Sequence, residues 1–118
     1  MTADIGIIGT GAVGQAVGSV LVTAGVGGQL LIAGRTPKQA TALADDLADL
    51  RAATGSPVRA AVAEVPDLRQ CAAVVVTVRA AFFNARANDV RMGGAYANTP
   101  VVRRLAEQLA GYDGTLLM

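Results

Sequence analysis

A chain of 118 residues is long enough to form one domain with a single core, and it leaves no room for a second full domain. The hydrophobic fraction is 53% but the aromatic fraction is only 3%, so small and branched aliphatic side chains must fill the core, as in α/β proteins whose strands are buried on both faces. With 16% charged residues, a net charge of +1 and no basic stripe, the chain does not fit a nucleic-acid-binding or membrane-surface protein.

Short apolar runs predict five strands, and segments with helical spacing predict three helices between them. The strands are expected at residues 4–8, 30–33, 58–62, 74–78 and 115–118. The helices are expected at residues 12–23, 37–53 and 100–111. Because the strands are continuous apolar runs rather than alternating ones, we expect an α/β fold with a parallel sheet and right-handed crossovers.

Several residues mark where the predicted elements begin and end. Gly25 is placed to end the first helix in a left-handed conformation. Thr36 and Pro37 form the N-cap and first helical position of the second helix. Residues 66–70 are expected to form a short turn. Residues 79–98 have no clear period, and a long irregular connection of this kind is usually functional or mobile.

The counts of histidine and cysteine limit the chemistry. Without histidine the chain lacks the usual near-neutral general base and the commonest metal ligand, so no metal site is expected. Cys71, the single cysteine, lies beside two alanines and is read as a small buried hydrophobe. A chain without an internal disulfide, a membrane-length apolar run or room for a signal peptide before Asp4 is expected to be cytoplasmic.

A glycine motif lies between the first predicted strand and the first predicted helix. This G-x-G-x-x-G consists of Gly9, Thr10, Gly11, Ala12, Val13 and Gly14. In that context the first glycine permits a tight turn, the second lets the backbone approach a pyrophosphate, and the third lets the helix pack on the strand. The free N–H groups and the dipole of the helix start favour an anion, so the motif predicts a dinucleotide site.

The end of the second predicted strand indicates which dinucleotide is bound. An acid that binds the adenosine ribose is normally found about 20 residues after the last glycine, and position 34 (14 + 20) is Gly34, followed by Arg35 and Thr36. A carboxylate would repel a 2′-phosphate, whereas an arginine and a hydroxyl can hold one. We therefore expect NADP to be preferred over NAD. The alternative is that Arg35 is a solvated turn residue, or stacks on adenine without discriminating.

The order of these motifs resembles the lactate/malate dehydrogenase family over nearly the whole chain. DIGIIGTGAVGQAVGSVL is similar to that family's opening strand, glycine loop and first helix, and ADDLADL to its following helix. CAAVVVTVRAA resembles the strand whose end passes under the cofactor. DVRMGGAYANTPVVRRLAEQL is similar to DRxDLxxxNxxIxxxLxxxI, with Arg91 and Asn98 at the matching spacing of seven (98 − 91). GTLLM resembles the strand that precedes a T-N-P motif.

The resemblance implies a Rossmann-type doubly wound domain over residues 1–118, truncated after the fifth strand and separated from a C-terminal catalytic domain. Such a domain would hold NADP or NAD for hydride transfer to a small 2-oxo acid, and would be inactive alone. Arg91 would be the catalytic loop arginine that polarises the substrate carbonyl, with Arg86 as a second substrate contact. The further cofactor contacts implied are Thr77, Val78, Arg79 and Asn98.

The chain also departs from that family's pattern. The second substrate arginine stands six residues before the closing one, and position 85 (91 − 6) is Ala85, with Arg86 one step away. Gly93 and Gly94 replace an Asp-Leu pair, and Gly34 replaces the usual acid. These differences leave membership in the wider superfamily more secure than any particular substrate.

Two other kinds of protein share the same opening motifs. One is an NADP-linked reductase of another Rossmann family, such as 6-phosphogluconate or ketopantoate reductases, in which a Gly-Arg pair after the second strand also accompanies NADP. The other is a non-catalytic nucleotide-sensing module, which usually keeps the acid that this chain lacks. The dehydrogenase reading implies a homo-oligomeric parent with a small-molecule substrate and no nucleic-acid or membrane partner.

Overall fold

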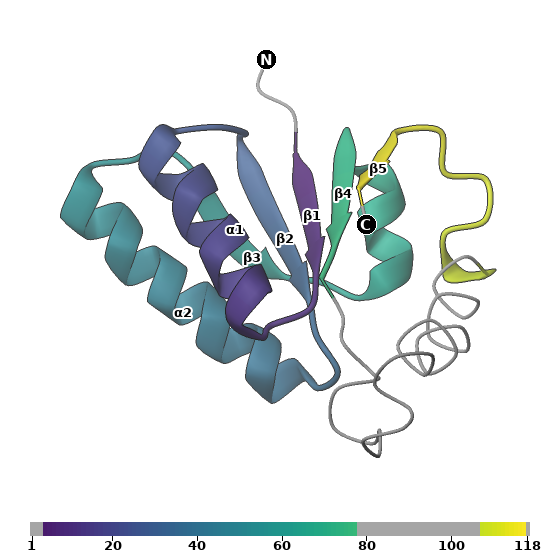
Figure 1. Ribbon diagram of the computed structural model, residues 1–118, viewed down its shortest axis with the longest axis horizontal. Helices are drawn as coiled ribbons and strands as arrows, with labels where there is room; N and C mark the ends of the chain where they lie inside the picture. Colours follow the sequence, from purple (N-terminus) through teal and green to yellow (C-terminus); the bar gives the residue numbers. More distant parts are fainter. Residues whose placement is uncertain (1–3, 78–106, 118) are drawn as a thin grey trace, which may run out of the picture.

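A five-stranded parallel sheet organises the protein, as shown by a computed structural model that describes residues 4–77 and 107–117 (Figure 1). The strands are β1 (Ile5–Ile8), β2 (Gln29–Ala33), β3 (Arg59–Val62), β4 (Ala73–Val76) and β5 (Thr115–Leu117). Their order across the sheet is β3-β2-β1-β4-β5, and every adjacent pair is parallel. The predicted α/β fold of Rossmann type is confirmed.

The helices are divided between the two faces of the sheet. Helices α1 (Ala12–Ala24) and α2 (Pro37–Thr54) lie side by side on one face, and the short 3₁₀-helix η1 (Val65–Gln70) lies on the other (Figure 1). Right-handed crossovers explain this division. The chain steps in one direction from β1 to β3 and then returns past β1 to β4, so the connection before β4 must cross the opposite face.

Two apolar clusters hold these layers together. The α1–α2 side is built around the buried side chains of Ile7, Val22, Leu30, Ile32, Ala40, Leu43, Ala44, Leu47 and Val58. The other side contains Ile8, Ala33, Leu68, Cys71, Val74 and Leu109. Alternate residues of β1 and β2 therefore belong to opposite clusters, as expected for strands buried on both faces. No aromatic side chain belongs to the buried set of either cluster, in agreement with the composition.

The predicted end of the first helix and the predicted start of the second are confirmed. The Thr36 hydroxyl accepts a hydrogen bond from the Gln39 N–H at 3.3 Å and so caps α2, which begins at Pro37. Gly25 ends α1 with φ 69°, and Gly55 ends α2 with φ 70°. Both glycines adopt the left-handed conformation that side-chain-bearing residues avoid.

Two sequence predictions need correction in this region. Residues 66–70, expected to form a turn, belong to η1, because Pro66 favours a first helical turn and the Asp67 carboxylate accepts from the Glu64 N–H at 3.2 Å. The buried Leu68 then anchors this turn, with its side chain against Gly6. The fourth strand was expected to reach Val78 but ends at Val76.

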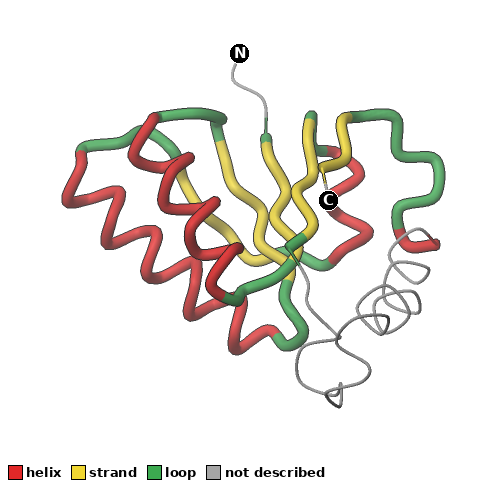
Figure 2. The backbone as a smooth tube through the Cα atoms, in the orientation of Figure 1, coloured by secondary structure: helices red, strands yellow, loops and turns green. Residues whose placement is uncertain are grey.

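The sheet brings the ends of its strands together beside the start of α1. In Figure 2 the parallel strands finish at one edge, the edge where α1 and α2 begin. Two backbone hydrogen bonds tie this edge, from the Gly9 N–H to the Ala33 oxygen at 2.9 Å and from the Thr77 N–H to the Ile8 oxygen at 2.8 Å. Strand order reverses between β1 and β4, and ligands of open α/β sheets bind outside the carboxyl edge at such a switch point.

Candidate functional site

The glycine loop between β1 and α1 is a tight turn packed against the end of β4. Gly9 adopts φ 116°, which a residue with a side chain rarely reaches. A Cβ on Gly14 would overlap the Gly9 carbonyl oxygen and lie 3.1 Å from the Thr77 hydroxyl oxygen. The first and third glycines therefore have the predicted structural roles: one makes the turn and the other lets α1 approach the strands closely.

Gly11 differs from the other two glycines, because no part of the described protein requires a glycine there. Its backbone angles, φ −75° and ψ −167°, are open to any residue. A Cβ built on it meets no atom within 4 Å. Among the described residues, the remaining reason for a glycine is to leave space beside the backbone. The space fits the close approach of a pyrophosphate to the backbone that the motif predicts.

The start of α1 supplies unpaired donors next to that space. Gly11 is the N-cap and no side chain caps the helix. The first backbone hydrogen bond of the helix runs from the Gln15 N–H to the Gly11 oxygen at 2.9 Å, so the N–H groups of the preceding turn have no partner within the helix. With no acidic residue in the first turn, these donors and the helix dipole favour a bound anion.

The loop after β2 lies directly against the glycine loop. A Cβ on Gly34 would come within 2.9 Å of the Thr10 methyl carbon, so glycine at this position lets the two loops touch. Arg35 and Thr36 follow, and both are exposed at the carboxyl edge of the sheet. The Thr36 oxygen accepts the capping hydrogen bond, which leaves its O–H free to donate. The region therefore offers a guanidinium and a hydroxyl, with no carboxylate at residues 34–36.

Thr77 lies where the sequence placed it, at the end of β4 beside β1. Its hydroxyl donates to the Ile8 oxygen at 3.0 Å, and its N–H donates to the same oxygen at 2.8 Å. The hydroxyl hydrogen is thus already used inside the protein. Thr77 fixes the switch point and can offer a ligand only its acceptor lone pairs.

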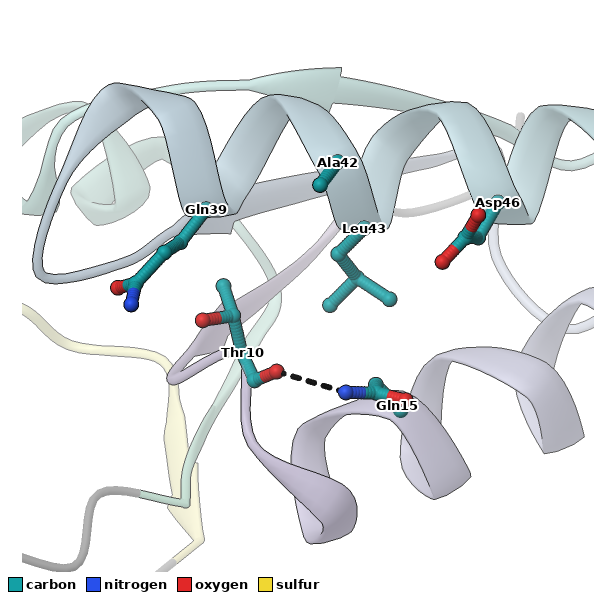
Figure 3. Close-up of a pocket in the computed structure, with 6 residues that line it drawn as sticks. All are labelled: Thr10, Gln15, Gln39, Ala42, Leu43 and Asp46. Carbon is teal, nitrogen blue, oxygen red and sulfur yellow. Dashed lines mark hydrogen bonds between the residues drawn. The ribbon is translucent and has the colours of Figure 1, made fainter.

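A shallow groove of about 190 Å³ runs between α1 and α2 behind the glycine loop. Its lining residues are Thr10, Gln15, Gln39, Ala42, Leu43 and Asp46 (Figure 3). On the α1 side of this groove Gln15 donates from its side-chain amide to the Thr10 carbonyl oxygen at 3.1 Å. Sequence reasoning missed Gln15, because only the fold of the loop brings a residue of the helix back onto Thr10.

The other predicted site residues, Val78, Arg79, Arg86, Arg91 and Asn98, lie outside the described residues. The structure therefore brings together the glycine loop, the Gly34–Thr36 segment and Thr77. Within residues 4–77 and 107–117 no group of three or more acidic, cysteine or histidine side chains could hold a metal ion. The same residues include no helix long and apolar enough to cross a membrane.

Cys71 is a structural residue, as predicted. It is 4% exposed, and burial, assisted by the negative charge of Asp4, raises the pKa of its thiol. Its carbonyl oxygen accepts a 2.8 Å hydrogen bond from the Tyr112 hydroxyl, whose pKa is raised by burial and by Cys71 and Asp113. A thiol that holds its proton more tightly is a poor nucleophile, so this group does not support covalent catalysis.

The raised pKa values of Cys71 and Tyr112 predict a loss of stability in alkali. In the folded state the pKa of Cys71 lies above its unfolded value of 9.0, so the unfolded state releases its proton first as the pH rises. The free energy of unfolding should therefore fall as the pH rises past about 9. Urea unfolding at a series of pH values measures the slope. Cys71→Ala should flatten it, and an unchanged slope would contradict the assignment to this thiol.

Comparison with known proteins agrees with this geometry. The family model described as NADP oxidoreductase, coenzyme F420-dependent, matches residues 4–102. No curated protein sequence matches the chain. Among solved structures, the fold is similar to a minor L-lactate dehydrogenase from Enterococcus mundtii, with a TM-score of 0.84 and 21% identity over 98% of this chain and 36% of that one.

Two Cryptosporidium parvum enzymes have the same fold. The malate dehydrogenase has a TM-score of 0.83 and 20% identity over 98% of this chain and 37% of that one. The lactate dehydrogenase, solved with lactic acid and nicotinamide adenine dinucleotide, has a TM-score of 0.83 and 16% identity over 98% and 36%. The chain thus spans little more than a third of the length of these solved structures.

The resemblance to lactate and malate dehydrogenases is confirmed at the level of the fold, and the glycine loop, its open space and the switch point fit a dinucleotide. This chain is an NAD(P)-binding oxidoreductase domain of Rossmann type and belongs to the family described as NADP oxidoreductase, coenzyme F420-dependent.

Proposed function

We propose that this domain binds NADP(H) in preference to NAD(H) and presents the nicotinamide for hydride transfer. The observation that carries the proposal is the segment after β2, where Arg35 is exposed, no acid stands at residues 34–36, and Gly34 packs against Thr10 of the glycine loop. A pyrophosphate at the loop would place the adenosine ribose near this segment. The 2′-phosphate would then meet a guanidinium and the Thr36 O–H rather than a repelling carboxylate.

The residues of the chain bind and orient the cofactor. Gly11 leaves the space in which the pyrophosphate approaches the backbone, and the unpaired N–H groups that begin α1 donate to its oxygens. Gly14 and Thr77 hold α1 against the carboxyl edge of the sheet, so the donors keep a fixed direction. The nicotinamide, when bound, supplies the hydride chemistry, and the protein supplies geometry and charge.

For the other reactant we propose a small 2-oxo acid, interconverted with its 2-hydroxy acid. The fold neighbours, which are lactate and malate dehydrogenases, and the sequence resemblance support this choice. These neighbours are much longer chains than this one. Arg91 would polarise the substrate carbonyl, Arg86 would contact the substrate, and Val78, Arg79 and Asn98 would border the cofactor. A separate catalytic domain would supply the proton donor, within a homo-oligomeric parent protein, so the chain alone should bind cofactor and catalyse nothing.

A second candidate comes from the family description. The matched family is named for coenzyme F420-dependent NADP oxidoreductases, and a deazaflavin could replace the 2-oxo acid as the hydride partner. Both candidates use the same nicotinamide site and differ only in what lies opposite it. Titrating the NADPH-saturated parent protein with pyruvate or oxaloacetate, and separately with F420, distinguishes them, because only the true partner should oxidise bound NADPH.

The experiment that tests the cofactor proposal is calorimetric titration of the chain with NADPH and, separately, with NADH. We expect NADPH to bind at least about tenfold more tightly, because the charge-assisted hydrogen bonds to the extra phosphate have no counterpart in NADH. Equal affinities, or tighter binding of NADH, would contradict the NADP preference while leaving the dinucleotide site intact. Binding of neither would contradict the proposed function of the chain itself.

A further inference from the structure

Gln15 makes two hydrogen bonds to the glycine loop, one from its side chain and one from its backbone. Its side-chain amide donates to the Thr10 oxygen at 3.1 Å (Figure 3), and its backbone N–H donates to the Gly11 oxygen at 2.9 Å. The side chain is exposed, so its burial adds little to the core. The contact also spans five residues, which is not a usual intrahelical side-chain bond. This side-chain hydrogen bond therefore fixes the peptide between Thr10 and Gly11.

That peptide has two orientations with opposite electrostatic effects. In a trans peptide the C=O and the N–H point in opposite directions, and no described peptide bond is cis. Holding the Thr10 oxygen toward Gln15 therefore aims the Gly11 N–H away from Gln15 and from the α1–α2 groove. A flipped peptide would exchange the two groups, placing a carbonyl oxygen where the N–H donor had been.

Gly11 makes such a flip inexpensive. Flipping a peptide rotates ψ of the residue before it and φ of the residue after it, and glycine accepts positive and negative φ about equally well. A Cβ on Gly11 would meet no protein atom within 4 Å, so packing does not hold this residue either. The glycine that admits the cofactor thus leaves its own peptide loosely defined unless another group holds it.

We propose that Gln15 is a positioning residue for the pyrophosphate, holding the Thr10–Gly11 peptide with its N–H, rather than its carbonyl oxygen, available on the side of the loop away from Gln15. The role rests on the proposed function of the loop, because it matters only when an anion binds there. It concerns the part of the ligand that NADPH and NADH share. Loss of the Gln15 hydrogen bond should weaken the binding of both dinucleotides by the same factor and leave the ratio of their affinities unchanged.

The test compares Gln15→Met with Gln39→Met by titration with NADPH and NADH. Methionine keeps the length of the side chain without a donor, and Gln39 is a matched control from the other wall of the same groove, with no side-chain hydrogen bond among the described residues. Gln15→Met should raise both dissociation constants roughly three- to tenfold, the effect expected of one hydrogen bond, while Gln39→Met stays within about twofold of wild type. Gln15→Asn, whose amide is too short to reach, should repeat the loss.

A spectroscopic measurement separates positioning from general loss of structure. In ¹⁵N-labelled protein the Gly11 amide signal should move or broaden in Gln15→Met, while amides of β1, β2 and β4 stay in place. Wild-type affinities in both Gln15 variants, with an unmoved Gly11 signal, would overturn this role alone. A wild-type chain that binds neither dinucleotide would overturn the proposed function and this role with it.

Discussion

Replacing Gly14 with alanine should destabilise the protein by about 3 kcal/mol and abolish measurable dinucleotide binding. The new methyl group would overlap the Gly9 carbonyl oxygen and crowd the Thr77 hydroxyl. The first neighbour is backbone and the second is fixed by its hydrogen bond to the Ile8 oxygen, so α1 has to move away from the sheet. Since small domains are stable by only about 5–15 kcal/mol, urea unfolding should detect the change readily.

The matched control for Gly14→Ala is Gly11→Ala, in which the methyl group points into open space. It should change the free energy of unfolding by less than about 1 kcal/mol, the scale of an N-cap substitution. It should nevertheless weaken NADPH binding, because the methyl group fills the space assigned to the pyrophosphate. A Gly11→Ala variant that binds NADPH as tightly as wild type would contradict that assignment.

Replacing Arg35 with aspartate should lower the affinity for NADPH by about a hundredfold and leave NADH binding within about threefold of wild type. One or two hydrogen bonds to a charged group contribute about 1.5–3 kcal/mol each, and the new carboxylate adds repulsion toward the 2′-phosphate. Titration of wild type and variant with both dinucleotides measures the change. Because Arg35 is exposed, the effect should shrink as ionic strength rises.

Arg59→Asp is the control for charge alone. Arg59 is also exposed, but it is the first residue of β3. It therefore lies at the amino end of the parallel strands, whereas the glycine loop lies at their carboxyl end. The same change of charge there should alter NADPH affinity by less than about threefold, because screening weakens charge effects beyond about 10 Å. Equal losses in the two variants would mean that Arg35 acts through net charge rather than by meeting the phosphate.

The order of elements and the glycine loop could be predicted from the sequence, because local patterns determine them. The short apolar run at residues 30–33, stopped by Gly34, predicts a strand, and Thr36 and Pro37 specify a helix start by their own chemistry. The roles of Gly9 and Gly14 follow from their place between a strand and a helix. Each of these signals lies within a few consecutive residues.

The features that could not be predicted from the sequence depend on contacts between distant segments, or arise where one residue has two roles. The turn at residues 66–70 is the helix η1, and its buried Leu68 packs beside Gly6 of β1, a contact between segments far apart in the sequence. The sequence shows Gly34 in place of the usual acid, but not that this glycine lets Thr10 touch the loop after β2. Gln15 had no sequence signal, because its partner is reached only when the loop has folded.

The most direct test of the dinucleotide site is an NMR titration of the ¹⁵N-labelled chain with NADPH, following each backbone amide. We predict that the amides of Gly11, Ala12 and Val13 shift most, because their N–H groups face the proposed pyrophosphate at the start of α1. Saturable shifts centred there would support the binding site described. Shifts confined to other elements, or no shift at any NADPH concentration reached, would contradict it.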